Sequence, residues 1–568
     1  MSSSLPLWVQ SDGTLLLDAR HPLCEEALNA LRPIAELTKR PGHLHTYRMT
    51  PVSLWNAAAN GENADSVVEK LRRVARFGIP VSVEREIRER MGSFGRFRLR
   101  SGPEGLYLTS DVPDRLRMAF EWPDAAECFD SSPENSEIRV AVKPDRRGAL
   151  KSALAARGCP VVDEAGFRSG GSLAVGFKEI NADGQSVSLR SYQREALDAF
   201  LGPDRNGGGS GVAVLPCGAG KTWVGMAALA ALGCETLILT PNAMSVTQWI
   251  RELLRNTTLG EEEVGEYTGS SKQVRPVTVA TYQVLTYRRS KTGGHPHWKL
   301  FEDRDWGLII YDEVHLLPAP VFRMTADLQA TRRLGLTATL VREDGRETDV
   351  FALIGPKRYE LAWKRGEREG WIAEAACHEI RVPLPEPAAR QYREAPPRSR
   401  HRIAGENPAK AEVVRGLLVR HAGMPTIVIG QYLNQLRRLA AELGLPLVTG
   451  SMPQEERKKL FDRFNRGEIG TLLVSKVANF AVDLPDAAVA IQVSGSYGSR
   501  QEEAQRLGRV LRPKKSGSAA SFYTLVSEET DEVEFSRNRG RFLVEQGYAY
   551  SVDVWEAAGV SGAEGAAT

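Results

Sequence analysis

Cysteine is scarce in this sequence and follows no pattern. The 568 residues include six cysteines, and no two of them form a CxxC pair. Isolated cysteines argue against a disulfide framework, and the missing CxxC pairs argue against a structural zinc site. We therefore expect neither kind of cross-linked fold.

Long apolar runs are also missing. The longest one extends from Trp223 to Leu232, about half of the roughly 20 residues that a membrane-spanning helix needs. The first residues, MSSSLPLWVQSDG, lack the basic and then apolar order of a signal peptide. We expect a soluble protein of the cytoplasm with no membrane partner.

Neither sign of charge is in large excess. The 74 Lys and Arg residues face 71 Asp and Glu residues, which leaves a net charge of +3. This balance excludes a nucleic-acid binder that works by bulk charge, so any basic surface must be local. Apolar residues make up 42% and charged residues 26% of the chain, as in globular proteins, and the length predicts about three to four domains.

From Val212 onward, short apolar strands alternate with helical segments. GVAVLP, TLILT, LIIY and LGLTAT belong to a first series, and TIVIG, PLVTG, TLLVSK, AVAIQV and SFYTLV to a second. Near-continuous apolar strands are typical of parallel sheets covered on both faces. The fold class is therefore α/β, with two tandem units. Residues before about 100 show mostly helical spacing, and a small α+β module follows them.

The segment VLPCGAGKT has the pattern of a phosphate-binding loop between a strand and a helix. Gly218 and Gly220 lie in the loop, and the helix is expected to start at Lys221. Backbone N–H groups of such a loop bind phosphate, Lys221 would neutralise the β- and γ-phosphate oxygens, and Thr222 would ligate Mg²⁺. The strict pattern has glycine where this chain has Leu215, so a chance GKT tripeptide is the alternative, made less favourable by the strand–loop–helix setting.

Two adjacent carboxylates follow a buried strand in LIIYDEVH. Asp312 would hold Mg²⁺ through water, and Glu313 would polarise the attacking water. Taken alone, the pair would more often be a solvated strand end. Its place after the phosphate loop, with two strand signals between, allows both motifs to share one sheet and weakens that alternative.

The segment QEEAQRLGRVLRPKK places three residues on one helix face in the second unit. Gln505, Arg509 and Arg512 stand at i, i+4 and i+7. Arginines here would supply positive charge to the departing γ-phosphate, whereas a basic solvated helix is the alternative. Phosphate loop and carboxylates on one unit, with arginines on the next, favour a motor whose cleft opens and closes with ATP.

Several segments occur in the order of one known family: LRSYQREAL, LPCGAGKT, YDEVH, LGLTATLVREDG, SKVANFAVDLPDAAVAIQVS and EAQRLGRVLRPKK. Together they resemble the XPB-type DNA helicases of superfamily 2 in their bacterial form. REDG after the TAT motif, and QRLGRVLR in place of the commoner QxxGRxGR, are specific to this group. The match runs from about Leu189 to Tyr550, and HTYRMTPVSLWNAAANG is the best-matching stretch of the N-terminal part.

The resemblance implies two RecA-like lobes, ATP with Mg²⁺, and 3′-to-5′ movement on duplex or junction DNA in repair or transcription. By position it implies the following roles: adenine contact for Arg190 and Gln193, phosphate and Mg²⁺ binding for Lys221 and Thr222, hydrolysis for Asp312 and Glu313, a link to DNA for Thr337 and Thr339, ligand sensing for Asp483, completion of the ATP site for Gln505, Arg509 and Arg512, and strand separation for the RED element Arg342, Glu343 and Asp344. Without the resemblance, the RED element would be interpreted as a charged turn.

The patterns and the resemblance together divide the chain into six regions. They are a helical N-terminal XPB-like domain (1–104), a small α+β damage-recognition-like domain (105–185), the ATP-binding lobe 1 (186–365), a linker with a thumb-like insertion (366–410), lobe 2 (411–552) and a disordered tail (553–568). The thumb region, Pro385 to Asn407, is proline-rich and shows no clear helical period. Its basic residues either contact phosphates or are solvated: Arg398, Arg400, His401 and Arg402.

We expect a monomer that binds DNA in the cytoplasm, at the nucleoid. Glu137 and Lys143 lie six residues apart, which is not the spacing of a metal-dependent nuclease core. Strand cutting would therefore need a nuclease or repair protein as a partner. Two other functions stay open: an ATP-gated clamp on DNA, and an ATPase that tracks along RNA. Glu313 with two arginines argues against the clamp, whereas DEVH does not identify the track.

Overall fold

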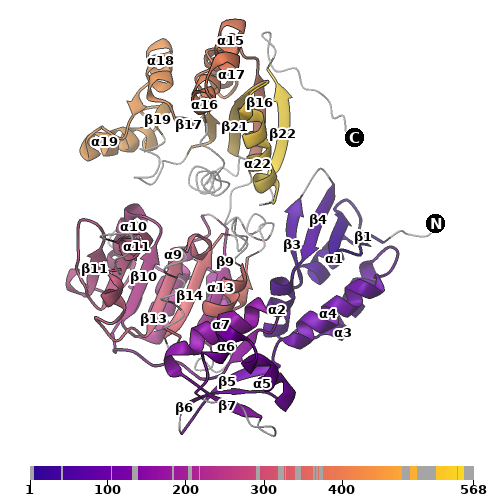
Figure 1. The fold of residues 1–568 in the computed structure, drawn as a ribbon. Helices are drawn as coiled ribbons and strands as arrows, with labels where there is room; N and C mark the ends of the chain where they lie inside the picture. Colours follow the sequence, from indigo (N-terminus) through magenta and orange to yellow (C-terminus); the bar gives the residue numbers. More distant parts are fainter. Residues whose placement is uncertain are drawn as a thin grey trace. The chain divides into compact units, whose positions relative to one another are not determined.

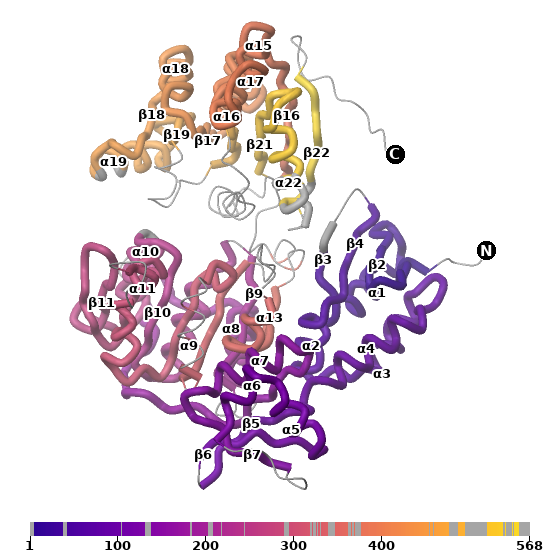
Figure 2. The backbone as a smooth tube through the Cα atoms, viewed as in Figure 1, coloured from indigo at the N-terminus to yellow at the C-terminus, as the bar shows by residue number. Residues whose placement is uncertain are grey.

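The computed structural model describes residues 5–39, 43–103, 105–130, 138–181, 184–202, 208–216, 218–288, 295–317, 321, 325, 328–329, 331–338, 347–361, 365, 369, 375–475, 487–494, 520–545 and 548–555. The chain forms two compact units. The first comprises Met1–Leu37, Leu44–Pro216 and Gly220–Leu361, and the main part of the second is Ala362–Thr568 (Figures 1 and 2). Within the described part of the chain, no helix is long and apolar enough to cross a bilayer.

The N-terminal module of the first unit is mixed rather than mostly helical. Its elements are β1 (Leu7–Val9), β2 (Thr14–Asp18), α1 (Cys24–Leu31), β3 (Ala35–Lys39), β4 (Leu44–Met49), α2 (Pro51–Ala59), α3 (Ala64–Val74) and α4 (Val81–Ser93). The strands form a sheet in the order β1-β2-β4-β3. The segments with helical spacing, Cys24 to Leu37 and Ser66 to Gly78, contain α1 and most of α3, but the first continues into β3 and the second beyond the end of α3. Helical spacing missed the sheet because strands of three to six residues carry too few alternations to stand out.

A small α+β module follows, and it begins earlier than the predicted boundary at residue 105. Its elements are β5 (Phe97–Gly102), β6 (Gly105–Thr109), α5 (Pro113–Phe120), α6 (Pro123–Ala126), β7 (Arg139–Val142), α7 (Arg147–Ala156) and β8 (Val161–Asp163). The sheet order is β7-β6-β5-β8, so β5 is an inner strand. Phe97 and Leu99 are fully buried in this module's core, and for that reason residues 97–104 belong to it.

Lobe 1 completes the first unit. Its elements are α8 (Ser191–Leu201), β9 (Ser210–Val214), α9 (Lys221–Leu232), β10 (Thr236–Thr240), α10 (Ala243–Asn256), β11 (Val264–Tyr267), β12 (Val277–Thr281), α11 (Tyr282–Thr286), β13 (Leu308–Asp312), β14 (Arg332–Thr337), α13 (Glu347–Leu353) and β15 (Lys357–Glu360). The sheet has seven parallel strands in the order β11-β12-β10-β13-β14-β9-β15. The α/β class is confirmed, and the carboxyl ends of β9, β13 and β14 meet at one edge of the sheet.

The second unit contains another seven-stranded parallel sheet, in the order β18-β19-β17-β20-β21-β16-β22. Its elements are β16 (Ala375–Val382), α15 (Glu386–Glu394), α16 (Pro397–Gly405), α17 (Lys410–Arg420), β17 (Thr426–Gly430), α18 (Leu433–Leu443), β18 (Leu447–Val448), α19 (Gln454–Asn465), β19 (Thr471–Ser475), β20 (Val489–Gln492), β21 (Ala520–Ser527), α22 (Asp531–Glu545) and β22 (Ala549–Val554). Lobe 2 therefore starts with β16, inside the region predicted as linker and thumb.

The thumb-like region is helical, contrary to the sequence interpretation. Pro385 and Pro396 occupy the N-cap positions of α15 and α16, and Pro387 and Pro397 fall in their first turns. Proline fits there because its fixed φ suits the helix start and its missing N–H has no partner to lose. The prolines thus mark the beginnings of two short helices rather than an irregular loop.

Candidate nucleotide site in the first lobe

The phosphate-binding loop lies between β9 and α9, as predicted. The loop contains Gly218 (φ +82°) and Gly220 (φ +75°), and α9 begins at Lys221. The positive φ of Gly220 favours glycine there, and a Cβ atom at this position would lie 2.7 Å from Nε2 of Gln193, at the far end of that side chain. The structure thereby places Gln193 of α8 directly against the loop.

Lys221 and Glu313 meet at the carboxyl edge of the sheet. The distance between Lys221 Nζ and Glu313 Oε1 is 2.9 Å, and both side chains are largely buried. Glu313 has left-handed backbone angles (φ 51°, ψ 55°), which are strained for a residue with a side chain. Such strain is typical of residues whose direction matters for function. Here it turns the carboxylate out of the strand and toward the lysine.

Two aromatic side chains hold Asp312. Trp249 of α10 donates from Nε1 to Asp312 Oδ2 at 3.0 Å, and the Tyr282 hydroxyl donates to the Asp312 backbone oxygen at 2.9 Å. Burial, and then the neighbouring Glu313 carboxylate, raise the pKa of Asp312 to about 6. Burial would also raise the pKa of Glu313, but Lys221 and His315 outweigh it and leave that pKa lowered. The two neighbouring carboxyls therefore have pKa values shifted in opposite directions, up for Asp312 and down for Glu313.

His315 connects this pair to Thr337 at the end of β14. The ring nitrogen Nδ1 lies 2.6 Å from Thr337 Oγ1 and 3.5 Å from Glu313 Oε2. Both His315 and Thr337 are buried. Thr337 was predicted to link the nucleotide to DNA, and in the structure His315 lies between Thr337 and Glu313.

The donor set fits a nucleoside triphosphate with Mg²⁺. Oε2 of Glu313 is buried and makes no hydrogen bond to the residues that the structure describes, and the Asp312 carboxyl beside it has a raised pKa. Carboxylate oxygens are the ligands that Mg²⁺ prefers, and Lys221 at the start of a helix suits phosphate. Lys221, Asp312 and, one residue further along α9, Thr222 would hold these groups.

The remaining predicted residues fall into two groups. Arg190 precedes α8 and donates its backbone N–H to Gln193 Oε1 at 2.9 Å, so the two adenine candidates are neighbours. The others lie outside the described residues: Thr339, Arg342, Glu343, Asp344, Asp483, Gln505, Arg509 and Arg512.

The four basic residues of the thumb-like region differ in their surroundings. Arg398 is exposed, and Arg402 makes an ion pair one turn along its helix. Arg400 lies over the Tyr392 ring, 5.8 Å from its centroid. His401 is 3% exposed and packs edge-on against Phe535, so it can neither contact a phosphate nor be solvated.

Sequence reasoning missed Trp249, Tyr282 and His315. The sequence could have indicated a role for His315, since it stands two residues after Glu313 in the same motif. No sequence pattern indicates a role for Trp249, because its helix shows an ordinary amphipathic pattern and its contact with Asp312 depends on how α10 packs. Tyr282 follows β12 at the same edge of the sheet, but its partner is a backbone oxygen that no sequence pattern reveals.

Comparison with known proteins gives relatives over nearly the whole chain. Family models match residues 367–564 (ERCC3/RAD25/XPB C-terminal helicase), 186–342 (type III restriction enzyme, res subunit) and 7–130 (helicase conserved C-terminal domain). A DNA 3′-5′ helicase XPB of Kineococcus radiotolerans is 52% identical over 548 residues, 96% of each chain. The protein of the same name from Mycobacterium tuberculosis is 50% identical, over 96% of this chain and 97% of its own.

A eukaryotic relative is more distant. The general transcription and DNA repair factor IIH helicase/translocase subunit XPB/SSL2 of Saccharomyces cerevisiae is 32% identical over 618 residues, which cover 97% of this chain and 72% of the yeast protein. The match therefore extends through both units and the N-terminal module.

Proposed function

Since this chain belongs to the XPB family of DNA 3′-5′ helicases, we propose that it couples ATP hydrolysis to 3′-to-5′ movement on DNA and to opening of the duplex. The observation that carries the proposal is the 2.9 Å contact between Lys221 and Glu313 beside the buried Asp312. A lysine at a helix start and two carboxylates at one sheet edge are the groups that phosphoryl transfer to water requires.

The residues have separate tasks in this proposal. Lys221 neutralises the β- and γ-phosphate oxygens, which takes its ammonium away from Glu313. The freed Glu313 carboxylate then accepts a proton from the attacking water, while Trp249 keeps Asp312 in place. Bound Mg²⁺ supplies charge neutralisation at the phosphates, held by Asp312 and Thr222. Gln193 and Arg190 bind adenine, and Gln505, Arg509 and Arg512 complete the site, as the resemblance to the family implies.

Duplex or junction DNA is the partner we propose, in repair or transcription, with a nuclease or repair protein acting beside it. We propose further that the chain acts as a monomer in the cytoplasm, at the nucleoid. Arg342, Glu343 and Asp344 would separate the strands, and Thr337, Thr339 and Asp483 would link nucleotide and DNA.

The test is steady-state ATPase activity with and without DNA. Glu313→Gln removes the charge that polarises water and keeps the shape, so we expect a fall of about 10²–10³-fold or more in kcat. Glu302→Gln, at an exposed position after Phe301, is the matched control and should hydrolyse ATP like the parent. A Glu313→Gln protein that hydrolyses ATP as fast as the parent would refute the proposal.

Strand displacement on duplexes with a 3′ or a 5′ overhang tests polarity, and unwinding should require the 3′ overhang. Slow hydrolysis that no nucleic acid stimulates would instead favour an ATP-gated clamp. Stimulation by RNA that DNA cannot compete away would favour an RNA track.

A further inference from the structure

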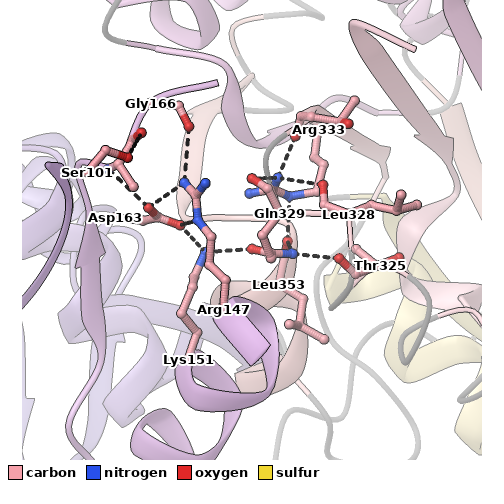
Figure 3. A network of polar contacts seen from close by, with 12 residues as sticks. Ser101, Arg147, Lys151, Asp163, Gly166, Thr325, Leu328, Gln329, Arg333 and Leu353 are labelled. Atoms are coloured by element: carbon pink, nitrogen blue, oxygen red, sulfur yellow. Dashed lines mark hydrogen bonds and ion pairs between the residues drawn. The ribbon is translucent and has the colours of Figure 1, made fainter. Parts of the chain in front are cut away.

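A cluster of buried charges lies where the small α+β module packs on lobe 1. It consists of Arg147 and Lys151 of α7, Asp163 of β8 and Arg333 of β14 (Figure 3). We call these four residues the interface cluster. Asp163 accepts hydrogen bonds from Arg147 at 2.6 Å and from Lys151 at 2.9 Å. All four side chains are buried, and three of them are cationic.

Such a cluster is a costly way to join two modules. Burial lowers the pKa of Lys151 to about 8 despite the nearby Asp163 carboxylate, and burial lowers the pKa of Arg333 to about 10. Apolar side chains of similar volume often stabilise an interface as well or better than buried ions. The cost therefore favours a role in specific positioning over a role in stability.

A chain of hydrogen bonds leads from Lys151 to β13, the strand that ends at Asp312 and is followed directly by Glu313. Lys151 Nζ donates to Gln329 Oε1 at 2.8 Å, and Gln329 Nε2 donates to the Thr325 backbone oxygen at 2.7 Å. Thr325 Oγ1 in turn lies 3.0 Å from the hydroxyl of Tyr311, the residue before Asp312. We call Gln329, Thr325 and Tyr311 the relay. All three are almost completely buried.

Arg333 anchors β14, the strand next to β13, close to the relay. Its Nε donates to the Leu353 oxygen at 2.7 Å and its Nη1 to the Gln329 oxygen at 2.8 Å. Four residues further along β14, Thr337 contacts His315 beside Glu313. The interface cluster thus fixes both β13 and β14, and these strands end at the nucleotide site.

We propose that Lys151 and the relay are positioning residues, through which the small module sets the placement of Asp312 and Glu313 for hydrolysis. The proposal rests on the ATPase function proposed above. A contact that moves the small module, such as binding of duplex DNA, would act on the strand ends through Gln329 and Tyr311. A network of packed hydrogen bonds can carry such coupling, and only measured coupling establishes it.

The test is a double-mutant cycle on the DNA-stimulated ATPase. Lys151→Met removes the ammonium in the small module, and Tyr311→Phe removes only the hydroxyl at the other end of the relay. Each should lower kcat about tenfold, and the double variant should also lie near tenfold, because both changes break one connection. KM for ATP should stay at the parent value, since neither residue contacts the phosphate loop.

Lys143→Met is the matched control, because Lys143 donates to the Glu127 oxygen within the small module at 2.9 Å. Thr325→Val, which breaks the Tyr311 contact and keeps the side-chain shape, serves if Lys151→Met does not fold. Hydrogen exchange of 308–312 and 332–337 gives a second readout, and exchange should rise in the variants.

The two proposals fail in distinguishable ways. A parent protein without ATPase activity would contradict the proposed function itself. An active parent whose single variants keep the parent kcat, or whose single effects multiply to about a hundredfold in the double variant, would overturn the role of the relay.

Discussion

Two of the buried charge clusters that the structure describes in the first unit have excess charges of opposite sign. At the nucleotide site, Asp312 and Glu313 lie beside the single lysine Lys221. In the interface cluster, Arg147 and Lys151 share Asp163, and the third cation, Arg333, donates instead to backbone oxygens such as that of Leu353. Among the described residues, each cluster keeps one buried atom without a hydrogen bond, but the two atoms differ in kind: Glu313 Oε2 is an acceptor, whereas Arg333 Nη2 is a donor. The nucleotide site is thus suited to a cation from outside, and the interface cluster is not.

The sharpest test of this comparison is the same substitution in both clusters. Asp163→Asn leaves the buried cations Arg147 and Lys151 without their shared carboxylate, and we expect a loss of about 3–5 kcal/mol in the free energy of unfolding. Asp312→Asn removes one of two buried like charges and keeps an oxygen for Trp249, so stability should be unchanged or higher. Urea denaturation at pH 7 measures both. Equal losses in the two variants would contradict the assignment of opposite excess charges.

Lysine-to-methionine substitutions provide the converse test, with somewhat smaller effects. Lys221→Met leaves two buried carboxylates without a cation, and we expect a loss of about 3 kcal/mol. Lys151→Met removes one of three cations while Arg147 still holds Asp163, so the change should stay below about 1 kcal/mol. The measurement is again the urea midpoint, with Lys143→Met, at a half-buried position of the small module, as the control. A larger loss for Lys151→Met than for Lys221→Met would reverse the comparison.

The sequence motifs predicted the nucleotide site but not the interface cluster. Lys221, Asp312 and Glu313 stand in motifs whose order and spacing predict a shared sheet edge, and the structure brings them together. Lys151, Asp163 and Arg333 lie in ordinary helix and strand segments of two modules. Their contact depends on how the modules pack, and no periodicity within one segment encodes that.

The same limit applies to the fold. Strands with continuous apolar runs, such as β10 and β17, were predicted because both faces of a parallel strand are buried. β16 (AACHEIRV) and β22 (AYSVDV) alternate with polar residues and were missed. The preference of proline for helix starts could have predicted the helices of the thumb-like region, since its prolines stand where α15 and α16 begin.

The smallest expected effect is a difference in pH dependence between the parent and Lys151→Met. Because burial lowers the pKa of Lys151 to about 8 from 10.5, the unfolded chain binds this proton more tightly than the folded one between those values. Stability therefore rises with pH across that window, by about 1–2 kcal/mol between pH 8 and 10, and the cost of the buried charge is fully present below pH 8. Other groups titrate in this range, but they are common to parent and variant, so the difference between the two urea midpoints isolates Lys151. Parallel pH profiles would mean that burial does not lower the pKa of Lys151 in the folded chain, and the interface cluster could then not be described as holding a costly buried cation.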